Sequence, residues 1–101
     1  MQEKIGGRLQ DSQFRILFRK GATQIILFLA SKGRARYSEI KKQRYVIGDR
    51  SLSRILKELQ EYGLIKREAL ATFPVSTSYS LTEKGKIVAK HLNELKDLLS
   101  R

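Results

Sequence analysis

The chain has 101 residues, a length that predicts one compact domain over residues 1–101. Its formal net charge is +11, from 21 lysines and arginines against 10 acidic residues, which predicts an anionic partner. It has no cysteine and one histidine, His91, which excludes disulfides and thiolate chemistry and argues against any metal site or cofactor. The first seven residues lack a signal-peptide core and the longest apolar run, 25–30, is too short to cross a bilayer, so we expect a cytoplasmic protein without membrane contact.

Four helices and one short strand are expected before residue 63. A first helix over residues 12–20 places Phe14, Leu17 and Phe18 on one side. A second over residues 22–32 is apolar nearly all round and should be buried. Residues 34–37 are expected to form a short edge strand. A short helix then runs from Ser38, its expected N-cap, to residue 44.

The fourth helix, over residues 49–62, has two contrasting faces. Leucines and isoleucines recur at i, i+3, i+4 and i+7 and define one buried face, made by Leu52, Ile55, Leu56 and Leu59. At about 100° per residue, Arg50, Arg54 and Lys57 fall together on the opposite face.

The last third predicts a β-hairpin followed by a helix. Residues 64–69 and 75–81 form strands, with a turn at 71–74, and the second strand alternates Val75, Thr77, Tyr79 and Leu81 with three serines. Thr82 then caps a helix over residues 83–99. The predicted fold is mainly α with a small β-hairpin wing, which is a winged helix-turn-helix.

The basic residues gather where a helix-turn-helix meets DNA. Between residues 32 and 57 nine basic residues stand against two acidic ones. Long donors on one helix face suit the acceptors of base edges and phosphates. The candidate DNA contacts are Ser38, Lys41, Lys42, Arg44, Arg50, Ser51, Ser53, Arg54 and Lys57, with Arg67, Ser76 and Thr77 from the hairpin. The alternatives are a solvated helix face and a purely structural hairpin, whose tip is uncharged.

The last helix predicts an interface between two copies of the chain. Val88, Leu92, Leu95 and Leu99 are spaced four, three and four apart, a coiled-coil-like seam. The seam extends past the hairpin, where a small domain has little core to cover. We expect a homodimer interface here, joined by Phe14, Leu17 and Phe18, with packing on the chain's own core as the alternative.

Between about Thr23 and Gly85 a set of residues follows a known family pattern: Thr23, Ile26, Leu27, Gly33, Tyr37, Ser38, Glu39, Ile40, Leu52, Leu56, Glu58, Leu59, Glu61, Tyr62, Gly63, Leu64, Ile65, Pro74 and residues 79–85. In these residues the chain resembles the HxlR family of winged-helix regulators and, more loosely, MarR and PadR proteins. The resemblance implies dimeric DNA binding with the helix from Asp49 in the major groove. The chain departs from the family's frequent pattern at Ala22 (tryptophan), Gly48 and Asp49 (serine and proline), Ser76 (a basic residue) and in lacking an N-terminal cysteine, so no effector sensing is implied.

The expected function is therefore a homodimeric, sequence-specific transcription regulator that binds double-stranded DNA. Two alternatives stay open: a winged-helix part of a larger transcription or ribosome-associated assembly, and a non-specific architectural DNA binder. A basic protein without a polyanionic partner is a further possibility. No acid, base or nucleophile stands with His91 at a suggestive spacing, so an enzyme is not expected.

Overall fold

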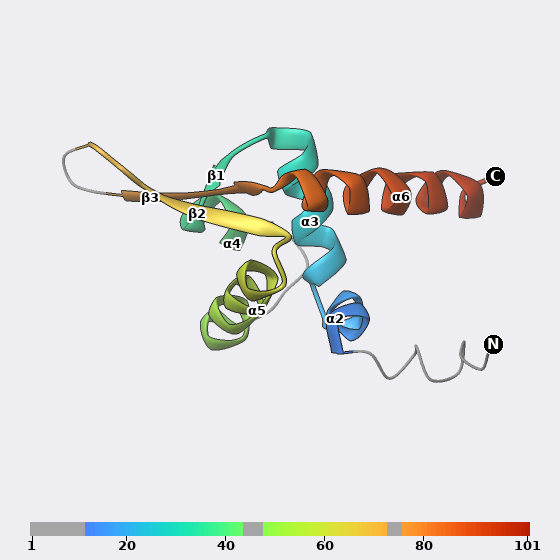
Figure 1. Ribbon diagram of the computed structural model, residues 1–101, viewed down its shortest axis with the longest axis horizontal. Helices are drawn as coiled ribbons and strands as arrows, with labels where there is room; N and C mark the ends of the chain where they lie inside the picture. Colours follow the sequence, from blue (N-terminus) through green and yellow to red (C-terminus); the bar gives the residue numbers. More distant parts are fainter. Residues whose placement is uncertain (1–11, 44–47, 73–75) are drawn as a thin grey trace.

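The computed structural model describes residues 12–43, 48–72 and 76–101 and confirms the predicted winged helix-turn-helix. The elements follow in the order α2 (Ser12–Arg15), η1 (Ile16–Phe18), α3 (Ala22–Lys32), β1 (Ala35–Arg36), α4 (Tyr37–Lys41), α5 (Asp49–Glu61), β2 (Ile65–Leu70), β3 (Ser76–Leu81) and α6 (Glu83–Leu99). The hairpin and α6 extend in opposite directions along the longest axis, and the molecule measures 54 × 31 × 26 Å (Figure 1).

The core forms where α3 and α5 pack beneath the sheet. Ile25, Ile26 and Leu29 of α3 are at most 1% exposed, as expected for a helix that is apolar nearly all round. The predicted buried face of α5 is confirmed, because Leu52, Ile55, Leu56 and Leu59 are all at most 4% exposed. This packing fixes which side of α5 turns outward.

The sheet places β3 in the middle, in the antiparallel order β1-β3-β2. Ala35 pairs with Tyr79, and Arg67 pairs with Tyr79 from the other side. The predicted alternation along β3 holds, since Tyr79 and Leu81 are buried on the core face. Ser78 on the other face is buried as well, at 2% exposed, because the central strand has Arg36 on one side and Glu68 on the other.

Two local predictions were wrong. The helix expected over residues 12–20 is a short α-helix followed by a 3₁₀ turn that ends at Phe18. Ser38 does not cap α4: the N-cap lies two residues earlier, at Arg36, and the Arg36 backbone N–H donates to Glu39 Oε1 at 2.9 Å. The helix also ends at Lys41, before its expected end at residue 44. The Glu39 carboxylate, on the third residue of the helix, therefore satisfies the N–H of the N-cap residue, as in one half of a capping box.

The joint between the hairpin and α6 explains the sequence from Thr82 to Gly85. Thr82 caps α6 as predicted, because its Oγ1 accepts from the Gly85 backbone N–H at 3.0 Å. The same hydroxyl donates to the Gly63 carbonyl at 2.5 Å. A Cβ on Gly85 would collide with the carbonyl of Leu64, so only glycine lets α6 approach the start of β2 this closely.

Candidate nucleic-acid interface

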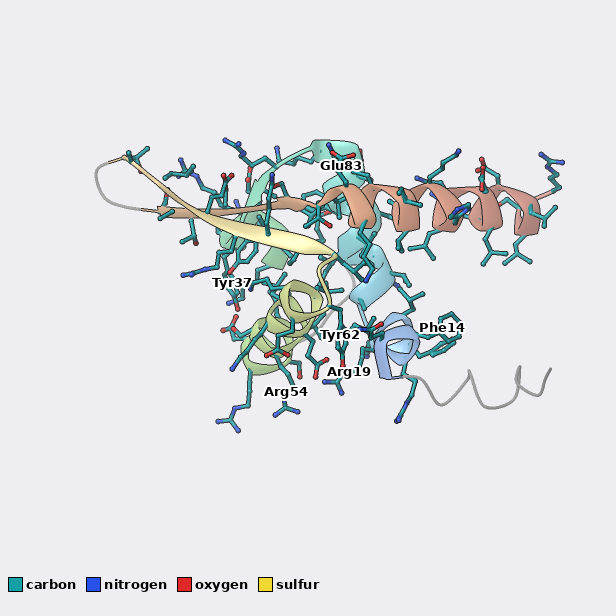
Figure 2. The ribbon with its side chains drawn as sticks, viewed as in Figure 1. Phe14, Arg19, Tyr37, Arg54, Tyr62 and Glu83 are labelled. Atoms are coloured by element: carbon teal, nitrogen blue, oxygen red, sulfur yellow. The ribbon has the colours of Figure 1, made fainter. Side chains whose placement is uncertain are left out.

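The face of α5 opposite the core presents three cations to solvent. Arg50, Arg54 and Lys57 are exposed, and none of them makes an ion pair with a residue that the structure describes. Figure 2 shows Arg54 on the side of α5 turned away from the sheet. The helix is held by its buried leucines, so these guanidinium and ammonium groups are available to an anionic partner.

The start of α5 is fixed by side chains of α4 instead of by a conventional cap. Gly48 is the N-cap residue and has no side chain to offer. The Lys41 ammonium lies 2.8 Å from Asp49 Oδ1 and 3.1 Å from Oδ2. The Tyr37 hydroxyl donates to Asp49 Oδ1 at 3.2 Å and lies 3.5 Å from Ser53 Oγ. Two of the expected DNA contacts on these helices, Lys41 and Ser53, therefore have partners inside the protein.

The same contacts shift the ionisation of this pair. The hydrogen bond from Lys41, with smaller help from its charge and from Tyr37, lowers the pKa of Asp49 below its ordinary value of 3.8. The hydrogen bond to Asp49, with the carboxylate's charge, raises the pKa of Lys41 above 10.5. Both groups are charged at neutral pH, so the interaction is a full ion pair.

The remaining expected contacts on the two helices lie at the surface. Ser38 and Lys42 are exposed at the two ends of α4, and Ser51 is exposed on α5. Arg44 lies outside the described residues. The expected helix contacts that the structure describes are thus all exposed.

Strand parity places the two basic residues of the hairpin on opposite faces. Arg67 shares a face with Ile65 and Tyr79, which is the face that packs on the helices. Lys66 pairs with Ser80 and points to the other side. Arg67 is therefore on the side of the sheet where α5 lies, whereas Lys66 is not. Ser76 and Thr77 are half-buried at the outer end of β3, and the Ser76 hydroxyl lies 3.3 Å from Thr72 Oγ1.

Ion pairs that the sequence did not predict neutralise part of the positive charge. Lys32 Nζ lies 3.4 Å from Glu39 Oε2, and Arg34 Nη2 lies 3.6 Å from Glu68 Oε1. The Arg34–Glu68 pair crosses the outer face of β3, and its partners are 34 residues apart in sequence. Only the strand order brings them together, and no local pattern reveals it.

Apolar surface gathers away from the basic stripe, on the N-terminal helices and on α6. Phe14 (43% exposed) and Phe18 (70%) form an edge-to-face pair with ring centroids 5.3 Å apart. Val88 and Leu92 of the predicted seam pack against the chain's own core, while Leu95 and Leu99 are 52% and 77% exposed. The seam thus begins on the body of the protein and continues beyond it, because every residue from 93 to 101 is exposed.

Within residues 12–43, 48–72 and 76–101, no three side chains that could ligate a metal ion lie together, and no helix has the length and apolarity to cross a membrane.

Comparison with known proteins gives consistent matches. The HxlR-like helix-turn-helix family matches residues 19–101. The uncharacterized HTH-type transcriptional regulator YvaP of Bacillus subtilis is 41% identical over 71 residues, which are 70% of this chain and 66% of that protein. An uncharacterized HTH-type transcriptional regulator of Methanothermobacter thermautotrophicus is also 41% identical over 71 residues, 70% of this chain but 54% of its own length. The reduced form of the transcriptional regulator YodB from B. subtilis superposes with a TM-score of 0.76 at 29% identity, covering 96% of this chain and 89% of that one.

Proposed function

Because the chain belongs to the HxlR-like helix-turn-helix family of transcriptional regulators, we propose that it binds double-stranded DNA sequence-specifically, as a homodimer, in the cytoplasm. The observation that supports this most directly is the exposed stripe of Arg50, Arg54 and Lys57 on the one helix that the helix-turn-helix presents outward. The positions of this stripe and of the apolar surfaces support the base contacts, the phosphate contacts and the dimer in turn.

The two ends of α5 have different tasks in this proposal. In helix-turn-helix proteins the N-terminal residues of the recognition helix contact base edges. Arg50, Ser51 and Arg54 lie in the first half of α5 and are our base-reading residues. Lys57 lies a turn further on and is assigned to phosphate. An arginine suits guanine, since its paired donors match the two acceptors of that base in the major groove.

Phosphate contacts from both sides would orient the protein on the duplex. We assign Lys42 and Ser38 to the backbone on the α4 side and Arg67, Ser76 and Thr77 to the backbone on the hairpin side. Arg67 lies on the face of the sheet where α5 packs, as a groove-flanking contact requires. Hydroxyl groups donate to phosphate without reading sequence, so the hairpin would add affinity more than specificity.

The homodimer is supported by where the apolar surface lies. All six large apolar side chains that are exposed in the described part of the chain are on α2, η1 or α6: Phe14, Phe18, Ile87, Leu95, Leu98 and Leu99. A hollow between the N-terminal helices and α6 is lined by Phe14, Leu17, Leu64 and Val88. In a symmetric dimer the same patch would be covered on both copies, with the outer half of α6 packed on its partner.

Selection from random duplexes tests this function. We expect an enriched palindrome whose half-sites lie about one helical turn apart, roughly 34 Å, because a two-fold dimer presents two recognition helices. Sedimentation of the protein with that duplex should give two chains per site. Tight binding without an enriched sequence would instead indicate an architectural DNA binder, and no duplex binding at all would point to a role inside a larger assembly.

A further inference from the structure

A cluster of four side chains joins the two helices of the helix-turn-helix. Tyr37 and Lys41 come from α4, and Asp49 and Ser53 come from α5; together they form what we call the α4–α5 clamp. Asp49 is at its centre, since it accepts from the Lys41 ammonium through both carboxylate oxygens and from the Tyr37 hydroxyl. Ser53 joins the cluster with its Oγ 3.5 Å from the Tyr37 hydroxyl.

Helix α4 is short, and the clamp adds to the few side chains that hold it. It is five residues long; Ile40 is buried, Tyr37 packs partly buried against the core, and Glu39 pairs with Lys32 of α3. Helices this short are marginal without tertiary contacts. The start of α5 also lacks a side-chain cap, because Gly48 is the N-cap residue. The clamp therefore connects α4 to α5 through polar side chains at the surface, since Lys41 and Asp49 are 52% and 64% exposed.

The clamp makes Lys41 less available to a DNA phosphate. Its ammonium is 2.8 Å from a carboxylate oxygen, so a DNA phosphate would have to compete with Asp49 for it. Two interpretations follow, and they predict opposite effects of removing Asp49. If Asp49 is merely an acid near DNA, its loss should strengthen binding by relieving repulsion from phosphates. If it positions α5, its loss should weaken binding although a negative charge has been removed.

We infer that Lys41 and Asp49 are positioning residues, which hold the recognition helix at the angle from which Arg50 and Arg54 reach the bases. This inference rests on the proposed DNA-binding function of α5. Lys41 then contributes to recognition through Asp49, whereas its neighbour Lys42, which is exposed and pairs with no described residue, contributes through phosphate.

The first test compares variants on the selected duplex. We expect Asp49→Ala and Lys41→Ala each to weaken binding about tenfold or more. The double variant should bind no more weakly than either single variant, because the effects of two substitutions within one interaction do not add. Lys42→Ala is the matched control with the same change of charge. It should lower the slope of log affinity against log salt by about 0.9 per protomer, and Lys41→Ala should leave that slope unchanged.

Two outcomes of this comparison would overturn the inference. One is tighter binding by Asp49→Ala. The other is a salt slope that falls as much in Lys41→Ala as in Lys42→Ala, because this would show that Lys41 contacts phosphate directly.

The second test needs no DNA, so it separates failure of the clamp from failure of the proposed function. The chain has no cysteine. Spin labels can therefore be placed at Ser38→Cys on α4 and Lys57→Cys on α5, both outside the clamp and both exposed. Double electron–electron resonance should give one narrow distance in the otherwise unchanged protein and a broadened or shifted distribution after Asp49→Ala. An unchanged distribution would overturn the inference whatever the DNA result. A broadened distribution, together with no duplex binding by the unlabelled parent chain, would uphold the clamp and reject the proposed function.

Discussion

Arg19 Nη2 lies 2.9 Å from Glu58 Oε2, and this ion pair connects the segment after η1 to the outward helix α5 (Figure 2). The pair is half exposed, so on its own it adds little stability, about 0–1 kcal/mol. Its significance is geometric, because η1 belongs to the apolar surface proposed for the dimer while α5 bears the proposed base-reading arginines. Glu58 is thus paired within the protein.

DNA affinity should depend steeply on salt. If each protomer neutralises several phosphates with Arg50, Arg54, Lys57 and Lys42, affinity should fall about a hundredfold or more between roughly 50 and 200 mM salt. Fluorescence anisotropy with a labelled duplex measures this directly. A flat plot of log affinity against log salt would rule out contact with the phosphate backbone.

Arg54 and Lys57 should differ in kind. Replacing Arg54 with alanine should cost about 1–3 kcal/mol and relax the preference at one or two base positions, because a base contact is lost. Lys57→Ala, the matched control one turn along α5, should weaken all sequences alike. Binding curves on the selected site and on its single-base variants separate the two. If Arg54→Ala kept both affinity and preference, α5 would not be the helix that reads the bases.

The dimer should be sensitive to charge on the outer half of α6. Leu95 is 52% exposed in the single chain, so Leu95→Glu leaves the fold intact but would bury an unpaired charge between two copies. We expect monomers with weak, non-specific DNA binding. Asn93→Glu, which adds the same charge on another face of α6, should remain dimeric. Sedimentation of both variants decides it, and a Leu95→Glu dimer that binds its site normally would place the interface elsewhere.

Gly85 should tolerate no side chain. A Cβ there meets the backbone carbonyl of Leu64, which is fixed in place because it accepts from the Thr82 N–H at 3.1 Å. Gly85→Ala should therefore destabilise the fold by about 1–3 kcal/mol or more, although alanine favours helix. Lys90→Ala, at an exposed position of the same helix, is the control. Urea unfolding measures both, and equal midpoints would mean that α6 can shift away from Leu64 without cost.

The clamp should be insensitive to pH near neutrality. The lowered pKa of Asp49 means that its contribution to stability is complete above its ordinary value of 3.8 and is lost as the pH falls through the folded-state value. The raised pKa of Lys41 means that its contribution is complete below 10.5 and is lost only above that. The stability difference between the parent chain and Asp49→Asn should be constant from about pH 5 to 9 and vanish in stronger acid. Urea midpoints over this range test it, and a step between pH 6 and 8 would contradict it.

Periodicity and caps were enough to predict most of the fold. The predicted limits of α3 and α6 agree with the structure, because strong local signals mark them. Gly33, with φ 88°, follows the last residue of α3, and the Thr82 hydroxyl caps the start of α6. The first helix was predicted too long, since spacing shows which residues share a face but not that the chain tightens into a 3₁₀ turn at Ile16. Burial of Ser78 could not be predicted either, because it depends on β1 arriving from a distant part of the chain.

The candidate site was predictable as a surface and less so residue by residue. Helical spacing alone placed Arg50, Arg54 and Lys57 on the outward face of α5. It gave no sign that Lys41 and Ser53 have protein partners, because Asp49 and Tyr37 meet them across two helices. The count of charges in the sequence also overestimated how many cations are unpaired. The acidic partners of Lys32, Arg34 and Lys41 come close to them only in the folded structure.

The strand order has a consequence for how the chain folds during synthesis. β1 is made before both helices of the helix-turn-helix, yet its partner is β3, which leaves the ribosome after them. A non-local pairing of this kind costs loop-closure entropy before any contact repays it. Until Leu81 has emerged, the apolar face of α5 has no complete sheet to pack on, and Ala35 has no strand beside it. A nascent chain that stalls within the hairpin would therefore expose its leucines, and truncation before β3 should give an aggregating product without partial activity.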